Sequence, residues 1–83
     1  MTAMTEQKYI VVRAKAPRKR KLDRFETKYM GGDPKVELKA FIDKYKLREI
    51  FSARIIPYLI DDSTPGITMR TLMPSGIAED ILQ

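Results

Sequence analysis

The chain has 83 residues, of which 43% are hydrophobic and 33% are charged. This length is near the lower limit at which one hydrophobic core can hold a fold, so a single domain is expected. The chain contains no Cys and no His, which excludes disulfides and thiolate metal sites and removes the commonest general base and metal ligand. We therefore expect a binding protein and not an enzyme, with no metal and no cofactor.

The positive charge is concentrated in the first third of the chain. The formal net charge is +5, and residues 1–30 hold nine Lys or Arg against three Asp or Glu. Such an asymmetry attracts phosphates or acidic protein surfaces. No stretch has the pattern of a signal peptide or a spanning helix, so we expect an intracellular protein that does not bind membranes. The expected location is the cytoplasm, or the nucleus in a eukaryote or a virus of eukaryotes, because Pro17–Asp23 is similar to a short nuclear localisation signal.

The first third predicts a basic β-hairpin. Residues 1–7 are small and polar and are expected to form a flexible end. Residues 8–15 alternate between an apolar and a largely basic face, which predicts a strand. A proline and four consecutive cations then predict a turn over 16–21. The alternation returns over 22–29 and predicts a second strand, with a short helix over 22–28 as the alternative.

A helix is predicted after Gly31-Gly32. Asp33 is suited to cap the free amides at its start, and Pro34 is suited to the first helical position. An apolar stripe follows at helical spacing, and the helix is expected to end between Lys46 and Phe51. The members of the stripe are Leu38, Phe41, Ile42 and Tyr45.

The second half predicts another hairpin and a short helix. Residues 54–60 are rich in β-branched side chains and predict a strand, while 61–66 predict a turn and 67–73 the return strand. Residues 77–82 follow a Pro-Ser-Gly stop and predict a final helix. The expected fold is therefore α+β: a single domain over 8–83, in which two β-hairpins pack on one central helix (β-β-α-β-β), with a short C-terminal helix.

The basic hairpin over residues 13–28 carries the sharpest functional signal. It holds eight Lys or Arg and two Asp or Glu, which is more positive charge than the protection of a sheet edge requires. Clustered cations neutralise phosphates and release counterions, so they give affinity without reading sequence. The favoured function is therefore non-enzymatic binding of DNA or RNA through the phosphate backbone. The predicted phosphate contacts are Arg13, Lys15, Arg18, Lys19, Arg20, Lys21, Arg24 and Lys28.

Aromatic and apolar side chains indicate further contacts. Tyr9 and Tyr58 are the candidates for stacking on bases. The alternative function is a protein-interaction module, such as a regulator, inhibitor or assembly subunit, that docks on a larger, partly acidic protein or on a second copy of itself. Its predicted interface comprises Phe51, Ile55, Ile77, Ile81 and Leu82. Asp61-Asp62 lies among turn-forming residues, so it is expected to shape a turn and to bind no metal.

Overall fold

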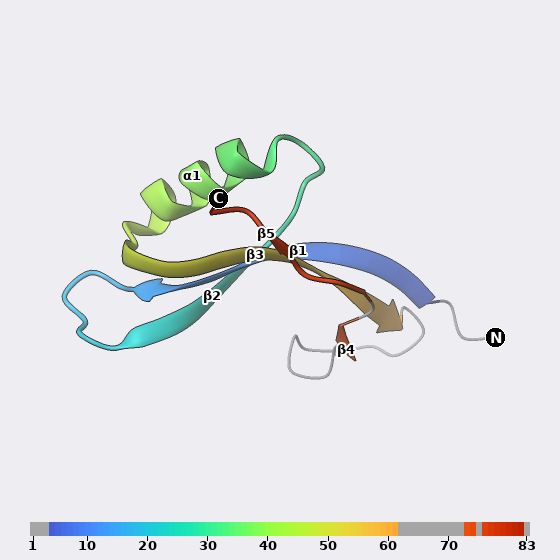
Figure 1. Cartoon of the computed structure of the whole chain (residues 1–83), viewed down its shortest axis with the longest axis horizontal. Helices are drawn as coiled ribbons and strands as arrows, with labels where there is room; N and C mark the ends of the chain where they lie inside the picture. Colours follow the sequence, from blue (N-terminus) through green and yellow to red (C-terminus); the bar gives the residue numbers. More distant parts are fainter. Residues whose placement is uncertain (1–3, 62–72, 75, 83) are drawn as a thin grey trace.

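The computed structural model describes residues 4–61, 73–74 and 76–82. It shows an antiparallel sheet and one helix, which confirms the α+β class (Figure 1). The strands lie in the order β2-β1-β3-β4, and β5 also pairs with β3. The elements in chain order are β1 (Met4–Lys15), β2 (Leu22–Lys28), α1 (Pro34–Tyr45), β3 (Arg48–Asp61), β4 (Met73–Pro74) and β5 (Glu79–Asp80). Within the described residues, no helix is long and apolar enough to cross a membrane.

β1 and β2 form the basic hairpin that the alternation predicts. Tyr9 lies opposite Lys28, and the pairing continues without a shift to Lys15 opposite Leu22. The helical alternative for residues 22–28 is therefore wrong. Pairing with β1 satisfies one side of the β2 backbone and turns the apolar face of β2 toward the core, which a short isolated helix would not achieve.

β1 is longer than the sequence predicts. It starts at Met4, so the expectation of a flexible end over residues 1–7 is wrong for residues 4–7. These residues pair with 58–61 of β3, and β3 is itself longer than predicted. Pairing between segments far apart in the chain gives regular structure to a polar stretch whose local pattern does not predict it. Residues 1–3 lie outside the described part of the chain.

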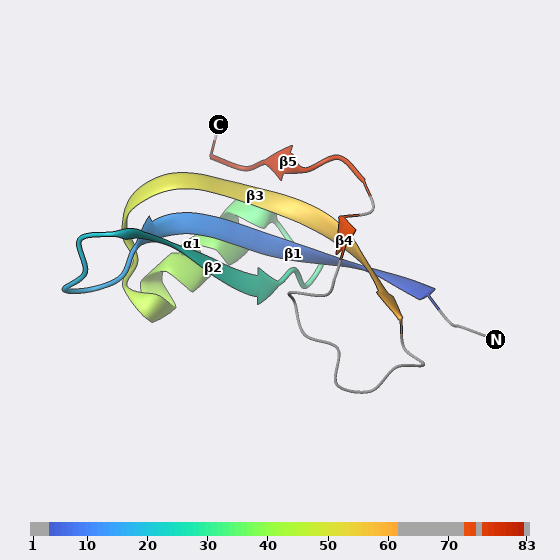
Figure 2. The same cartoon turned by 90° about the horizontal axis from the view of Figure 1, so that it is seen from below.

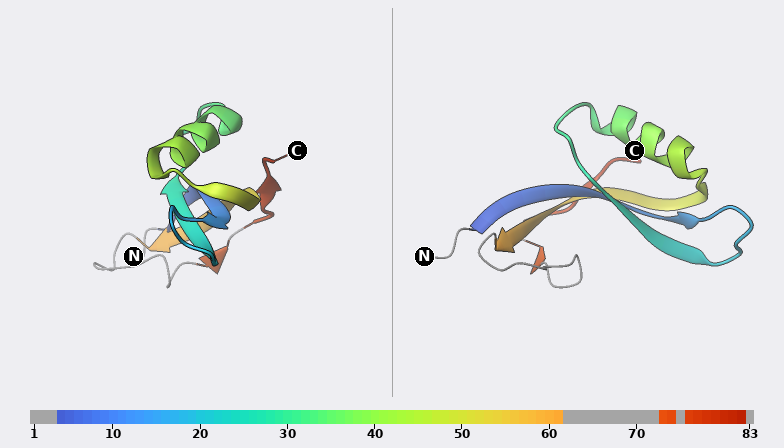
Figure 3. Two further views of the ribbon diagram at one scale, coloured as in Figure 1. Left: turned by 90° about the vertical axis from the view of Figure 1, so that its left-hand side faces the viewer. Right: turned by 180° about the vertical axis from the view of Figure 1, so that it is seen from behind.

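The core lies between α1 and one face of the sheet (Figures 1 and 3). Opposite residues of paired strands share a face, and Ile10 of β1 is opposite Ile55 of β3. Both are buried on the face that α1 covers. The other face carries no helix of the described chain (Figure 2). The buried core comprises Ile10, Val12, Ala14, Leu38, Phe41, Leu47, Ala53, Ile55 and Ile81.

The start of α1 matches the prediction. The Asp33 carboxylate accepts a hydrogen bond from a first-turn N–H at 3.0 Å, and Pro34 is the first helical residue. The Glu37 carboxylate closes the preceding loop, because it accepts hydrogen bonds from the N–H groups of Met30 and Gly32, each at 2.7 Å. The Asp33 carboxylate therefore occupies a first-turn amide, the kind of group that an anion at a helix start contacts.

The junction between α1 and β3 differs from the prediction. α1 ends at Tyr45, and not between Lys46 and Phe51. The reason is that Lys46 adopts a left-handed backbone conformation with φ 53°, which closes the helix. β3 then starts at Arg48 instead of residue 54, since its first residues extend the pairing with β1.

The C-terminal helix predicted over 77–82 is wrong. Its central residues form β5, which pairs with β3, and the Ile81 N–H donates a hydrogen bond to the Ala53 carbonyl at 3.0 Å. The side chain of Ile81 is part of the buried core. Burial of this side chain from a sheet edge outweighs the weak tendency of so short a segment to form a helix.

The predicted order β-β-α-β-β is not confirmed. Two short strands, β4 and β5, follow β3 on its outer edge. The predicted turn over 61–66 and return strand over 67–73 lie outside the described residues, apart from Asp61 at the end of β3 and Met73 at the start of β4. The helix is also not at the centre of the fold, because it lies on one face of the sheet. The central position is taken by β1, between β2 and β3.

Candidate nucleic-acid interface

The turn between β1 and β2 presents four consecutive cations. The Lys19 N–H donates a hydrogen bond to the Ala16 carbonyl at 3.1 Å, and Arg18 has φ 65°. A proline at the second turn position followed by a positive φ is the pattern of a type II turn. The four cations are exposed and form no ion pair with the described residues, so their charges are available to an anionic partner. They are Arg18, Lys19, Arg20 and Lys21.

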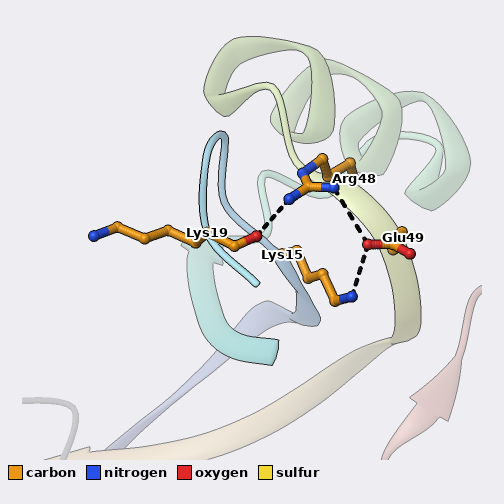
Figure 4. Close-up of polar contacts among 4 residues, drawn as sticks. All are labelled: Lys15, Lys19, Arg48 and Glu49. Atoms are coloured by element: carbon orange, nitrogen blue, oxygen red, sulfur yellow. Dashed lines mark hydrogen bonds and ion pairs between the residues drawn. The ribbon is translucent and has the colours of Figure 1, made fainter. Parts of the chain in front are cut away.

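Charged residues of β1 and β3 hold this turn in place (Figure 4). The Glu49 carboxylate lies 2.8 Å from the Lys15 ammonium and 3.4 Å from the Arg48 guanidinium. The same guanidinium donates a hydrogen bond to the backbone carbonyl of Lys19. The hydrogen bond from Lys15, and then the Lys15 charge, lower the pKa of Glu49 below its ordinary value. Glu49 is therefore ionised at neutral pH, and it ties the turn to β3 through Arg48.

Further cations lie at the same end of the molecule. The hairpin turn, the end of α1 and the start of β3 meet there (Figures 1 and 3). We call this region, residues 15–23 and 43–49, the basic end. It holds eight Lys or Arg and three Asp or Glu. Lys44, Lys46 and Arg48 are absent from the predicted site, because only the antiparallel pairing of β3 with β1 brings them there. No local signal in the sequence marks the helix end at Lys46 that turns the chain back into β3.

The other predicted phosphate contacts lie on the sheet face opposite α1. Arg13 is exposed, and its guanidinium carbon lies 5.3 Å from the centre of an aromatic ring on β3. Arg24 donates a hydrogen bond to the Tyr58 hydroxyl at 2.8 Å and forms an ion pair with Glu26 at 2.9 Å. Lys28 is exposed at the end of β2 that is distant from the turn. The eight predicted cations therefore do not form one patch, and Arg24 is engaged within the molecule.

The two tyrosines predicted to stack on bases pack against each other. Their ring centroids are 5.8 Å apart in an edge-to-face arrangement. Tyr58 is only 4% exposed, so its ring is not available to a base. Tyr9 is half-buried. Arg24 reaches across β1 from β2 and donates a hydrogen bond to the Tyr58 hydroxyl, and Tyr9 packs on the Tyr58 ring, so Tyr58 is engaged within the molecule.

The predicted protein interface is divided between core and surface. Ile55 and Ile81 are 3% and 6% exposed and belong to the core, so they cannot contact a partner. Phe51 is 65% exposed and Ile77 is 94% exposed, and Leu82 is half-exposed. Ile55 is buried because the pairing of β3 with β1 turns it toward α1. Phe51 is the aromatic residue over which Arg13 lies.

Comparison with known proteins gives no match to a family model, to a curated protein or to a solved structure. Within the described residues, no group of three or more His, Cys, Asp or Glu is placed to hold a metal ion. The arguments for function therefore rest on the geometry and charge of the basic end.

Proposed function

We propose that this chain is a non-enzymatic nucleic-acid-binding protein that contacts phosphates with its basic end. The observation that carries the proposal is the set of four exposed, unpaired cations on one turn, described above, whose backbone Arg48 holds in place. Fixing the turn before binding lowers the entropy cost of ordering it on a phosphate backbone. Lys44 in the last turn of α1 and Lys46 at its C-cap extend the same positive field beyond the hairpin.

The mode of binding follows from what surrounds these cations. Phosphate contacts fix position and give affinity, whereas base contacts give sequence specificity. The basic end consists chiefly of Lys and Arg on a turn and at a helix end, and the buried Tyr58 is not available for stacking. We therefore expect DNA or RNA binding with low sequence specificity and a steep dependence on salt.

The test is a salt titration of binding to labelled duplex DNA, duplex RNA and single strands. A variant with Ala at all four cations from Arg18 to Lys21 should bind roughly 30-fold or more weakly at about 50 mM salt. The slope of log affinity against log salt on a duplex should become shallower by about 3.6, since each of the four lost phosphate contacts contributes about 0.9. The charge-matched control variant has Ala at four cations that are exposed elsewhere on the molecule: Lys8, Lys35, Lys39 and Arg54. It should lose far less affinity for nucleic acid.

Two results would contradict the proposal. One is equal loss of affinity in the two variants, which would mean that only net charge matters. The other is no binding at low salt. In that case the alternative, docking on an acidic protein surface, gains support, because Phe51 is exposed beneath Arg13 and such pairs often anchor protein interfaces. Tighter binding of poly-glutamate than of duplex nucleic acid would identify that alternative.

A further inference from the structure

β2 forms an edge of the sheet, since within the described chain it pairs with β1 alone. One hydrogen bond shows how its backbone is oriented: the Tyr29 N–H donates to the Lys8 carbonyl at 2.9 Å. Successive residues of a strand direct their backbone N–H and C=O groups to opposite sides of the strand. The backbone groups of the odd-numbered residues of β2 therefore point toward β1, and those of the even-numbered residues point away from the sheet. The outward residues are Leu22, Arg24, Glu26 and Lys28.

A groove runs beside this edge, between β2 and α1. Its two parts have volumes of about 260 Å³ and 270 Å³, and Phe41 and Tyr45 of α1 line both. Phe25 of β2 lines the second part, and Met30, which lines the first, is 77% exposed. An unpaired strand edge is thus flanked by a groove in which two exposed apolar side chains, Met30 and Tyr45, lie among charged ones. Such an edge is a template for pairing with another strand.

We propose that the occupant of this edge is a second copy of the chain, with the two β2 strands antiparallel and centred on Phe25. Arg24 of each copy then lies opposite Glu26 of the other, and two-fold symmetry makes this pair twice. Both residues direct their backbone groups outward, so they exchange backbone hydrogen bonds. In the single chain the Arg24 N–H donates to the Asp23 carboxylate at 2.8 Å, and the Arg24 guanidinium forms an ion pair with Glu26 of the same chain at 2.9 Å. The dimer replaces the first contact with a hydrogen bond between strands and extends the ion pair to Glu26 of the second copy. The two Phe25 rings meet on the α1 face, beside the groove that Phe41 and Tyr45 line.

The charges of β2 select this register and this occupant. A register shift of two residues in one direction, of one strand relative to the other, sets Arg24 opposite Arg24 of the second copy. The same shift in the other direction sets Glu26 opposite Glu26. Both shifts also leave fewer residues paired, and like charges directly opposite each other are destabilising. The strand is therefore complementary to itself in one full-length register. This inference is independent of the nucleic-acid proposal, because none of the four turn cations takes part in it.

Sedimentation equilibrium of the full chain, from about 10 µM to about 1 mM, tests the dimer. The single variants Arg24→Glu and Glu26→Arg each place two like charges opposite each other, at both symmetric positions of the dimer. Each should raise the dissociation constant of the dimer roughly tenfold or more. An equimolar mixture of the two variants should form a heterodimer, because the acidic strand of one then faces the basic strand of the other. Recovery on mixing also shows that both variants are folded.

The double variant Arg24→Glu/Glu26→Arg tests the register. It exchanges the charges but keeps the strand complementary to itself, so it should dimerise as the wild type does. Circular dichroism should show that it is folded, since Arg24 also bonds Tyr58. A wild-type chain that stays monomeric to about 1 mM would overturn the proposal and leave the edge to a strand of another protein. A dimer that the single variants do not weaken, or that a folded double variant does not restore, would overturn it as well.

Discussion

Arg18, Lys46 and Glu49 have positive φ values of 65°, 53° and 51°. These are the non-glycine residues with positive φ in the described part of the chain, and all three lie in the basic end. An L-residue in this region costs on the order of 1 kcal/mol, and such strain often accompanies functional sites. The positive-φ strain of the described non-glycine residues is therefore concentrated in the region that we propose contacts phosphates.

Arg18 permits a separation of backbone strain from charge. Its place in the turn normally takes Gly or Asn, so Arg18→Gly should leave the free energy of unfolding unchanged or raise it by about 0.5 kcal/mol, with strain relief offsetting the entropy of glycine. The salt slope of binding should fall by about one. Urea denaturation and the salt titration measure the two effects.

Arg20→Gly is the matched control for that prediction. Arg20 is exposed and does not have a positive φ, so the substitution removes the same charge without relieving strain. It should lower the salt slope equally and the free energy of unfolding by about 0.5 kcal/mol. If Arg18→Gly destabilised the chain more than Arg20→Gly did, the turn assignment would be wrong.

At the scale of elements, Glu37 connects α1 to the loop that leads into it. Glu37→Ala removes the acceptor for the Met30 and Gly32 N–H groups and should lower the free energy of unfolding by about 1–2 kcal/mol, since hydrogen bonds to a charged group are the stronger kind. Glu37→Gln keeps one oxygen acceptor and should cost about half as much. Equal stability of the alanine variant and the wild type in urea denaturation would show that the loop does not depend on this contact.

The elements that the sequence predicts correctly are those with local signals. Asp33 and Pro34 define the start of α1 through interactions within one turn. The alternation over residues 8–15 and 22–28 predicts the hairpin, because a strand with one buried face must alternate. The run from Arg18 to Lys21 predicts the exposed cations of the candidate site for the same reason: no distant segment is needed to place them.

The elements that the sequence does not predict depend on distant contacts. Residues 77–82 have the pattern of a short helix, but Ile81 reaches the core only from an extended strand beside Ala53. Lys46 has no local signal for the left-handed conformation that ends α1. In the candidate site, Tyr58 is assigned to the surface from sequence, whereas in the structure it is 4% exposed and its hydroxyl bonds Arg24, a residue of a strand that is not its neighbour.

At the scale of the whole molecule, the basic end lies at one end of a long body whose principal extents are 45 × 25 × 20 Å (Figure 1). The proposed dimer joins two antiparallel β2 strands, and each strand starts at its own basic end. The two basic ends would therefore lie at opposite ends of one continuous sheet. A dimer of this kind could contact two separate stretches of phosphate backbone, which would raise its apparent affinity for long nucleic acids over short ones.

The helix end provides the last test of the basic end as a unit. Lys44 and Lys46 are remote from the hairpin in sequence, so a site confined to the turn would not need them. If the basic end binds as one surface, Lys44→Gln with Lys46→Asn should lower the salt slope by roughly one to two, because two phosphate contacts or their field are lost. Asn is chosen at residue 46 because it tolerates the left-handed backbone that ends α1.

The matched control is Lys35→Gln with Lys39→Gln, which removes the same charge from the first half of α1, where both side chains are exposed. It should leave the salt slope within about half a unit of the wild type. If both pairs lower the slope equally, the whole helix attracts phosphate only through net charge. If neither pair does, binding is confined to the hairpin turn, and the convergence of α1 and β3 on that end serves the fold by anchoring the turn through Arg48.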